Sequence, residues 1–228
     1  MPLFGGAPAR AGDSFQLLPE VDAFLKVDER TRIFLYTSST FSKSSGSGDS
    51  LSIQEGEAGA HVDYTLTPAV RRQLRDEDWV RSRYLWMRAG YNRARSLGEA
   101  ERDDRFRENR GVFELNARSL PLAGGIDLYG RARVDLRERN DDWSRRYRLR
   151  LGAERMAEVN GRAVIPYAEA EAVYDTRYDA WSQWRYKAGA ELELTRSWRI
   201  EPYFQLTANS RPEHSTTRAL GLVLKFYR

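Results

Sequence analysis

The feature that most constrains the fold of this chain is an alternation of apolar and polar residues with a period of two. The alternation is clearest in IDLYGRARVDLR, residues 126–137, where every even position is apolar or glycine and every odd position is Asp, Tyr or Arg. A β-strand points successive side chains to opposite faces, so this segment has one apolar face and one charged face. Each face needs a different environment in the folded chain.

Ten further segments repeat this pattern, and no helical periodicity of comparable strength occurs. Long polar connections, RERNDDWSR and YDTRYDAWSQ among them, alternate with shorter turns, one of which contains the hairpin signal Asn160–Gly161. We predict about eleven strands, with apolar faces within residues 19–27, 33–41, 58–66, 85–91, 113–117, 126–136, 147–153, 164–174, 184–194, 198–206 and 220–226.

Strand length and aromatic placement indicate that the apolar face meets lipid. Ten residues tilted by about 45° span roughly 24 Å, close to the apolar band of about 25 Å on a membrane barrel. The apolar faces carry Tyr147, Trp184 and Trp198 near their ends and Ala168 and Ala188 between them, as two interfacial girdles would. We predict an all-β fold, a transmembrane antiparallel up-and-down β-barrel in the bacterial outer membrane. A soluble barrel or sandwich is the alternative.

The basic residues favour a confined charged interior over a nucleic-acid surface. Only four of the 37 are lysine, and the arginines are interleaved with 33 acidic residues rather than clustered. The planar guanidinium pairs with carboxylates, whereas a nucleic-acid patch is less balanced in charge. We expect no nucleic-acid partner. We also expect no cofactor and no metal, because the chain has no cysteine and no phosphate-binding or metal-ligand spacing.

The strand number conflicts with a rule for membrane barrels. Single-chain bacterial barrels have even strand numbers, which put both termini on the periplasmic side. We therefore predict twelve strands, one of them hidden in residues 42–56 or 67–80, with ten as the fallback. The barrel is expected over residues 15–228, and residues 1–14 are expected to be a flexible N-terminus or the remnant of a signal peptide.

The C-terminal stretch ALGLVLKFYR resembles the assembly signal of bacterial outer-membrane barrels. Gly221, Leu224 and Phe226 stand in the expected places, whereas Ala219 replaces the usual polar residue and two residues follow the terminal aromatic. LPEVDAFL, HVDYTLTPAVR, RYLWMRAGYN, RYRLRLGAER and IPYAEAEAVYDTRYDAW resemble a family of Gram-negative outer-membrane barrels of uncharacterised function. The resemblance covers nearly the whole chain from Phe15 and implies fold and location but no substrate. Outer-membrane lipid and the barrel-assembly machinery are the partners expected of such a barrel.

The charged strand faces predict a lumen rich in arginine. If the hairpins set the register, arginines of two neighbouring strands lie side by side near mid-height, and the neighbouring wall carries two glutamates. A basic wall and an acidic wall create a transverse field, and rings of charge select ions in pores. We predict a small, passive, porin-like and anion-selective channel for small anionic solutes or acidic oligosaccharides, acting as a monomer. The residues expected along its path are Arg131, Arg133, Arg137, Arg146, Arg148, Arg150, Arg185, Lys187, Glu169, Glu171, Tyr129, Tyr167 and Tyr203.

Two alternatives remain open. Arginine and glutamate on adjacent strands can pair across the ladder and close the interior, giving a structural or binding barrel. Outer-membrane lipid hydrolases use a His–Ser pair, and the chain has His61 and the adjacent Glu213, His214 and Ser215. Neighbours on a strand face opposite ways, however, so His214 and Ser215 cannot share a hydrogen bond there. We expect no catalytic residues and no enzymatic activity.

The stretch YDTRYDAW is expected in an extracellular loop. Such a loop can gate the pore or bind a ligand. The simpler interpretation is that its arginine pairs with an aspartate and its aromatics anchor the loop at the membrane interface. The loop residues are Tyr174, Asp175, Arg177, Tyr178, Asp179 and Trp181.

Overall fold

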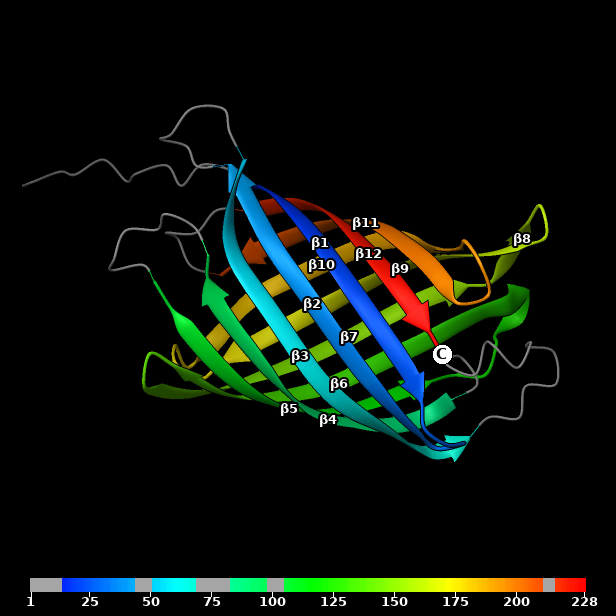
Figure 1. The fold of residues 1–228 in the computed structure, drawn as a ribbon, viewed down its shortest axis with the longest axis horizontal. Coiled ribbons are helices and arrows are strands. Elements are labelled where there is room, and N and C mark those ends of the chain that lie inside the picture. The colour runs from blue at the N-terminus through cyan, green and yellow to red at the C-terminus, as the bar shows by residue number, and fades with distance from the viewer. Residues whose placement is uncertain (1–13, 44–50, 69–82, 98–104, 211–215) are drawn as a thin grey trace, which may run out of the picture.

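The computed structural model describes residues 14–43, 51–68, 83–97, 105–210 and 216–228, which form a closed β-barrel (Figure 1). Among these residues, no helix is long and apolar enough to cross a membrane. The strands are β1 (Ser14–Lys26), β2 (Thr31–Lys43), β3 (Leu51–Pro68), β4 (Arg83–Ser96), β5 (Arg107–Arg118), β6 (Ile126–Arg139), β7 (Asp142–Arg155), β8 (Ala157–Val159), β9 (Arg162–Asp175), β10 (Ala180–Glu193), β11 (Trp198–Asn209) and β12 (Thr217–Tyr227).

Within the described residues, the wall of the barrel contains eleven strands, so the predictions of twelve and of ten are wrong. Residues 44–50 and 69–80 of the two segments in which a hidden strand was expected lie outside the described residues. β8 pairs only with β9 and continues the line of β7 beyond Met156, so it extends one strand rather than adding another (Figure 1). Successive strands are antiparallel, but β1 and β12 pair in parallel, from Ser14–Thr217 to Phe24–Tyr227. An odd number of alternating strands leaves the first and the last running the same way. Closure therefore requires one parallel pair, and the prediction of a wholly antiparallel barrel fails at this junction.

The apolar strand faces point outward and the charged faces point inward, as the alternation predicts. Leu128 and Leu149 are 46% and 50% exposed. The side chains of Arg133 and Arg148 are each 10% exposed, and Asp135 is completely buried. This arrangement is that of a membrane barrel, whose apolar exterior surrounds a polar interior.

Outward-facing aromatic side chains gather at both ends of the barrel. Where β9 ends and β10 begins, the ring of Trp181 lies 5.7 Å from that of Tyr174 and 6.3 Å from that of Trp184. At the opposite end, where β11 begins and β12 finishes, the rings of Trp198 and Phe226 are 4.9 Å apart. Aromatic rings at two levels, most of them the amphipathic rings of Trp and Tyr, are typical of the interfacial belts of a membrane protein.

The turns follow local sequence chemistry. Asn160 and Gly161 both have positive φ, 52° and 75°, as the type I′ hairpin predicted from this pair requires. Asn140 and Asp141 also have positive φ, 50° and 69°, so β6 and β7 are joined by a tight turn and not by the long loop predicted there. In the turn between β1 and β2, backbone N–H groups two and three residues ahead donate to Asp28 and hold the pKa of its carboxyl below the usual value.

Candidate functional site: the lumen

A charged cavity occupies the interior of the barrel. Its volume is about 790 Å³, and its lining runs from Gln16 and Thr217 near one end to Arg199 and Tyr227 near the other. Among the described residues that line it, thirteen are arginine and two are lysine, against nine carboxylates. A wall of eleven strands has room for such a cavity, because the interior of an eight-stranded barrel is just filled by side chains.

The structure brings nearly all the predicted lumen residues to this cavity. Twelve of the thirteen line it, and Glu171, which is 2% exposed, lies behind the arginines. The placement follows from strand alternation, which turns every second side chain inward. A role of these residues in an anion path stays a prediction.

The densest ion-pair network centres on Glu171 of β9. Four guanidinium groups contact its carboxylate, those of Arg131, Arg148, Arg150 and Arg185, at 2.7, 2.7, 3.1 and 3.5 Å. The register explains the convergence, since Glu171 is the direct partner of Arg150 on β7 and of Arg185 on β10. One buried carboxylate thus reduces the mutual repulsion of four cations.

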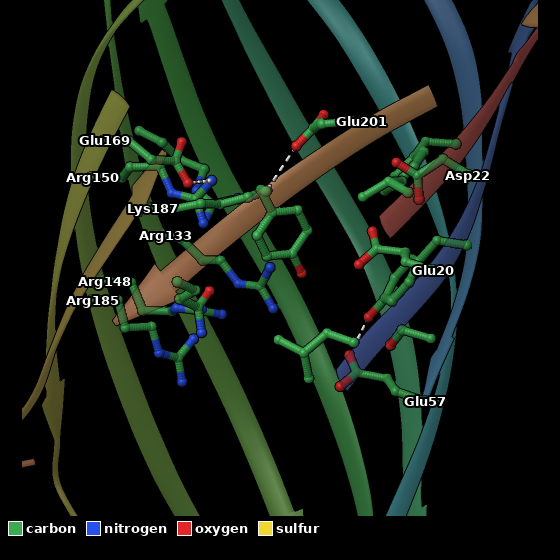
Figure 2. A pocket seen from close by; sticks show the side chains of 18 of the residues that line it. Glu20, Asp22, Glu57, Arg133, Arg148, Arg150, Glu169, Arg185, Lys187 and Glu201 are labelled. Carbon is green, nitrogen blue, oxygen red and sulfur yellow. Dashed lines mark hydrogen bonds and ion pairs between the residues drawn. The ribbon is translucent and has the colours of Figure 1, made fainter. Parts of the chain in front are cut away.

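Glu169 also belongs to the arginine wall. Its carboxylate lies 2.8 Å from a guanidinium nitrogen of Arg150 and accepts a hydrogen bond from the Tyr129 hydroxyl at 3.0 Å. From the sequence, Glu169 and Glu171 were predicted to form an acidic wall that faces the arginines. This prediction is wrong, because both glutamates lie among the arginines. Figure 2 shows where the facing carboxylates lie instead, on β1, β3 and β11: Glu20, Asp22, Glu57 and Glu201.

Further carboxylates lie behind the arginines and do not line the cavity. Arg133 contacts Glu114 at 3.1 Å and Asp135 at 2.5 Å, and Arg137 contacts Asp175 at 2.8 Å. The three acids are 5%, 0% and 0% exposed. These carboxylates lie deeper in the wall than the guanidinium groups with which they pair. The surface of the wall that faces the lumen is therefore cationic, although its arginines have carboxylate partners.

A stack of aromatic rings inside the lumen was not predicted from the sequence. Near the end of β1 and β12, the ring of Phe24 lies 4.7 Å from that of Phe34 and 4.8 Å from that of Tyr227, and the Arg32 guanidinium lies 4.7 Å from the Phe24 centroid. The three aromatic residues are buried. The sequence did carry a signal for this stack. Residues two positions apart on a strand share a face, and both phenylalanines have a charged residue two positions away, Asp22 and Arg32 respectively.

The predicted extracellular loop is a turn of residues 176–179 between β9 and β10. Asp175 belongs to β9, is completely buried inside the barrel and contacts Arg146 at 2.9 Å. Tyr174 and Trp181 belong to the outer aromatic group. The Arg177 backbone N–H, rather than its guanidinium, donates to the Asp175 carboxylate at 3.0 Å. The remaining loop residues are Tyr178 and Asp179, and the latter accepts a hydrogen bond from the Tyr174 hydroxyl.

Among the described residues, no serine is hydrogen-bonded to either ring nitrogen of His61. His61 is 3% exposed inside the barrel, with its ring 5.4 Å from that of Phe34 and 5.6 Å from that of Tyr36. Glu213, His214 and Ser215 lie outside the described residues. Within the described ranges, no group of three or more acidic or histidine side chains is arranged to hold a metal ion.

Fold and lumen together define an outer-membrane-type β-barrel with a salt-bridged interior. No protein-family model and no curated protein matches the chain. Among solved structures, the chain is similar to LpxR from Salmonella typhimurium, with a TM-score of 0.52 and 8% identity over 86% of this chain and 83% of that one. It is also similar to the beta domain of the Bordetella autotransporter BrkA, with a TM-score of 0.49 and 15% identity over 83% and 78% of the two chains.

The likeness to LpxR corrects one expectation. At 8% identity it shows the fold alone. LpxR is nevertheless an outer-membrane enzyme, so a barrel of this fold can carry an enzymatic activity. The prediction that this chain has no enzymatic activity is therefore contradicted. The resemblance to an uncharacterised barrel family stays a prediction, because no family model supports it.

Proposed function

We propose that the chain is a small, porin-like channel that passes small solutes and favours those carrying negative charge. The observation that carries this proposal is the lining of the cavity, where arginine and lysine outnumber carboxylates and where Glu114, Asp135 and Glu171 lie behind the cationic surface. A solute in the lumen meets guanidinium N–H groups before it meets their counter-charges. Walls of one charge in a low-dielectric enclosure concentrate ions of the opposite charge.

The proposal includes a location in the bacterial outer membrane. The apolar outer face and the aromatic groups at both ends support lipid as the surrounding medium. Insertion by the barrel-assembly machinery and a monomeric state belong to the same proposal. The closed wall supports the monomeric state, because it leaves no long strand edge for a second chain.

A closed binding or structural barrel is the second candidate, and one observation favours it. The stacked rings of Phe24, Phe34 and Tyr227, with Arg32 over the first of them, line the lumen near the end of β12. Such a cluster narrows a passage at that end. Conductance separates the two candidates.

The test is ion conduction across planar lipid bilayers under a salt gradient. Arg185 is the arginine to replace, because its side chain is 27% exposed and Glu171 keeps three closer partners without it. We expect stable conductance steps with an anion-selective reversal potential. In Arg185→Gln the selectivity should fall while folding is retained, because a cation at the cavity surface is lost.

Arg162→Gln is the matched control, since Arg162 is exposed at the start of β9, next to the hairpin turn. Its reversal potential should equal that of the unchanged protein. Folded protein, recognised by heat-modifiable mobility on a detergent gel, that stays electrically silent at high concentration would instead favour the closed barrel.

A further inference from the structure

Two lumen carboxylates of β1 stand apart from the ion-pair networks. Glu20 and Asp22 are two residues apart on the inner face of β1, and both line the cavity. Neither forms a salt bridge within the part of the chain that the structure describes. The side chains of Asp22 and Glu20 share a hydrogen bond, but Asp22 is only 6% exposed, and its Oδ1 atom has no hydrogen-bond partner among the described residues.

The cation beside Asp22 on the neighbouring strand is already engaged. Lys225 of β12 is the direct register partner of Asp22, but its Nζ atom lies 2.7 Å from a Glu191 oxygen and also contacts Glu201. The charge of this lysine is therefore shared by two other carboxylates. An unpaired buried carboxylate costs several kcal/mol, and a cationic group that entered the cavity would relieve that cost.

The arginine wall lies directly across the lumen from this pair. In the closed order of eleven strands, β6 is five strands from β1 in one direction, and β7 is five strands from it in the other. Figure 2 shows the consequence, with Glu20 and Asp22 on one side of the cavity and Arg133 and Arg148 on the other. Negative and positive poles thus face each other across one enclosed space.

From this opposition we infer that the lumen holds a binding site for a small zwitterion, with the cationic end at Glu20 and Asp22 and the anionic end on the arginine wall near Arg148 and Arg185. The inference goes beyond the proposed function, because it assigns a binding site for a solute that carries both charges, whether or not the lumen conducts ions. A solute with opposite charges at its two ends aligns with the transverse field and interacts favourably with both walls. A dianion of equal length is attracted by the arginine wall and repelled by Glu20 and Asp22.

The width of the barrel sets the length of the solute. Backbones on opposite sides of an eleven-stranded barrel are about 22 Å apart, given a strand spacing of about 4.8 Å and a tilt of about 40°. Side chains from both walls reduce this gap to on the order of 10 Å. An extended six-carbon amino acid suits such a gap, so 6-aminohexanoate is the probe and adipate is the dianion of matched length.

The experiment is isothermal titration of the full-length folded barrel in detergent with each probe at neutral pH. We expect 6-aminohexanoate to bind more tightly than adipate. In the double variant Glu20→Gln/Asp22→Asn its affinity should fall about tenfold, while adipate should bind as before or more tightly. The variant should fold, because it replaces two neighbouring acidic side chains that form no salt bridge with any described residue by neutral amides of the same shape, which can still hydrogen-bond to each other. Glu158→Gln, at an exposed residue of β8, is the control and should change neither affinity.

Three results would overturn the inference: equal affinity of the unchanged protein for the two probes, an unchanged affinity for 6-aminohexanoate in the double variant, or an equal loss of affinity for both probes in that variant. Binding in detergent does not require an open pore. A barrel that binds the zwitterion but is silent in bilayers would therefore contradict the proposed channel and leave this site standing. A conducting barrel that fails to discriminate between the probes would contradict the site alone.

Discussion

Glu171 offers the sharpest test of the salt-bridged interior. The change Glu171→Gln preserves the size of the side chain and removes its charge. In the folded barrel, four guanidinium groups within 3.5 Å would then surround a neutral amide. The amide presents one acceptor oxygen and an NH₂ group that cannot accept any of their hydrogen bonds.

The magnitude follows from burial. Removing one partner of a buried ion pair costs about 3–5 kcal/mol. Glu171 is 2% exposed, but the side chains of Arg150 and Arg185 are 24% and 27% exposed and remain partly solvated. We therefore expect the lower part of that range, about 3 kcal/mol, which lowers the equilibrium constant for folding by about two orders of magnitude.

The assay is urea unfolding of the barrel in phospholipid vesicles, followed by tryptophan fluorescence and by heat-modifiable mobility on a gel. Glu169→Gln is the graded comparison, because Glu169 shares a single arginine, Arg150, with the network. It should cost about 1–2 kcal/mol. Glu158→Gln should stay within about 0.5 kcal/mol of the unchanged protein. The reasoning is refuted if Glu171→Gln is no less stable than Glu169→Gln.

Two further predictions test the closure and the packing of the barrel. Val21→Cys with Leu224→Cys, direct partners in the parallel β1–β12 pair, should form a disulfide on oxidation in a chain that has no other cysteine, whereas a pair offset by two residues along β12 should not. A reversed yield on non-reducing gels would contradict the parallel closure. Gly221→Ala should cost about 1–3 kcal/mol, because a Cβ there would lie 1.9 Å from the ring of Tyr203. Gly111→Ala, whose Cβ would meet its nearest neighbour at 3.8 Å, should cost less in the same unfolding assay, and equal costs would contradict the packing of Tyr203 on glycine.

The sequence was sufficient to predict which side chains face the lumen. Alternation is a local property of an extended backbone, so Arg133 and Leu149 could be assigned to opposite faces from their positions alone. Eleven alternating segments were also visible, and eleven is the number of strands in the wall. The prediction of twelve came from a rule about termini, which assumes an antiparallel closure that β1 and β12 do not make.

Other features depended on contacts between distant parts of the chain. The length of the turn after Asp175 was overestimated, because polar composition does not distinguish a loop from the charged end of a strand that points into a lumen. The convergence of four arginines on Glu171 needed the register of β6, β7, β9 and β10 together. The aromatic stack around Phe24 joins residues more than 200 positions apart.

The sequence by itself determined that this chain forms amphipathic strands with an arginine-rich inner face. Only the tertiary structure decided that Glu20 and Asp22 lie across from Arg133 and Arg148, and that Glu171 lies behind the arginines instead of facing them. The physical reason is that the direction of a side chain is set by its own strand. What that side chain faces across a barrel depends on the number of strands and on how the last strand meets the first.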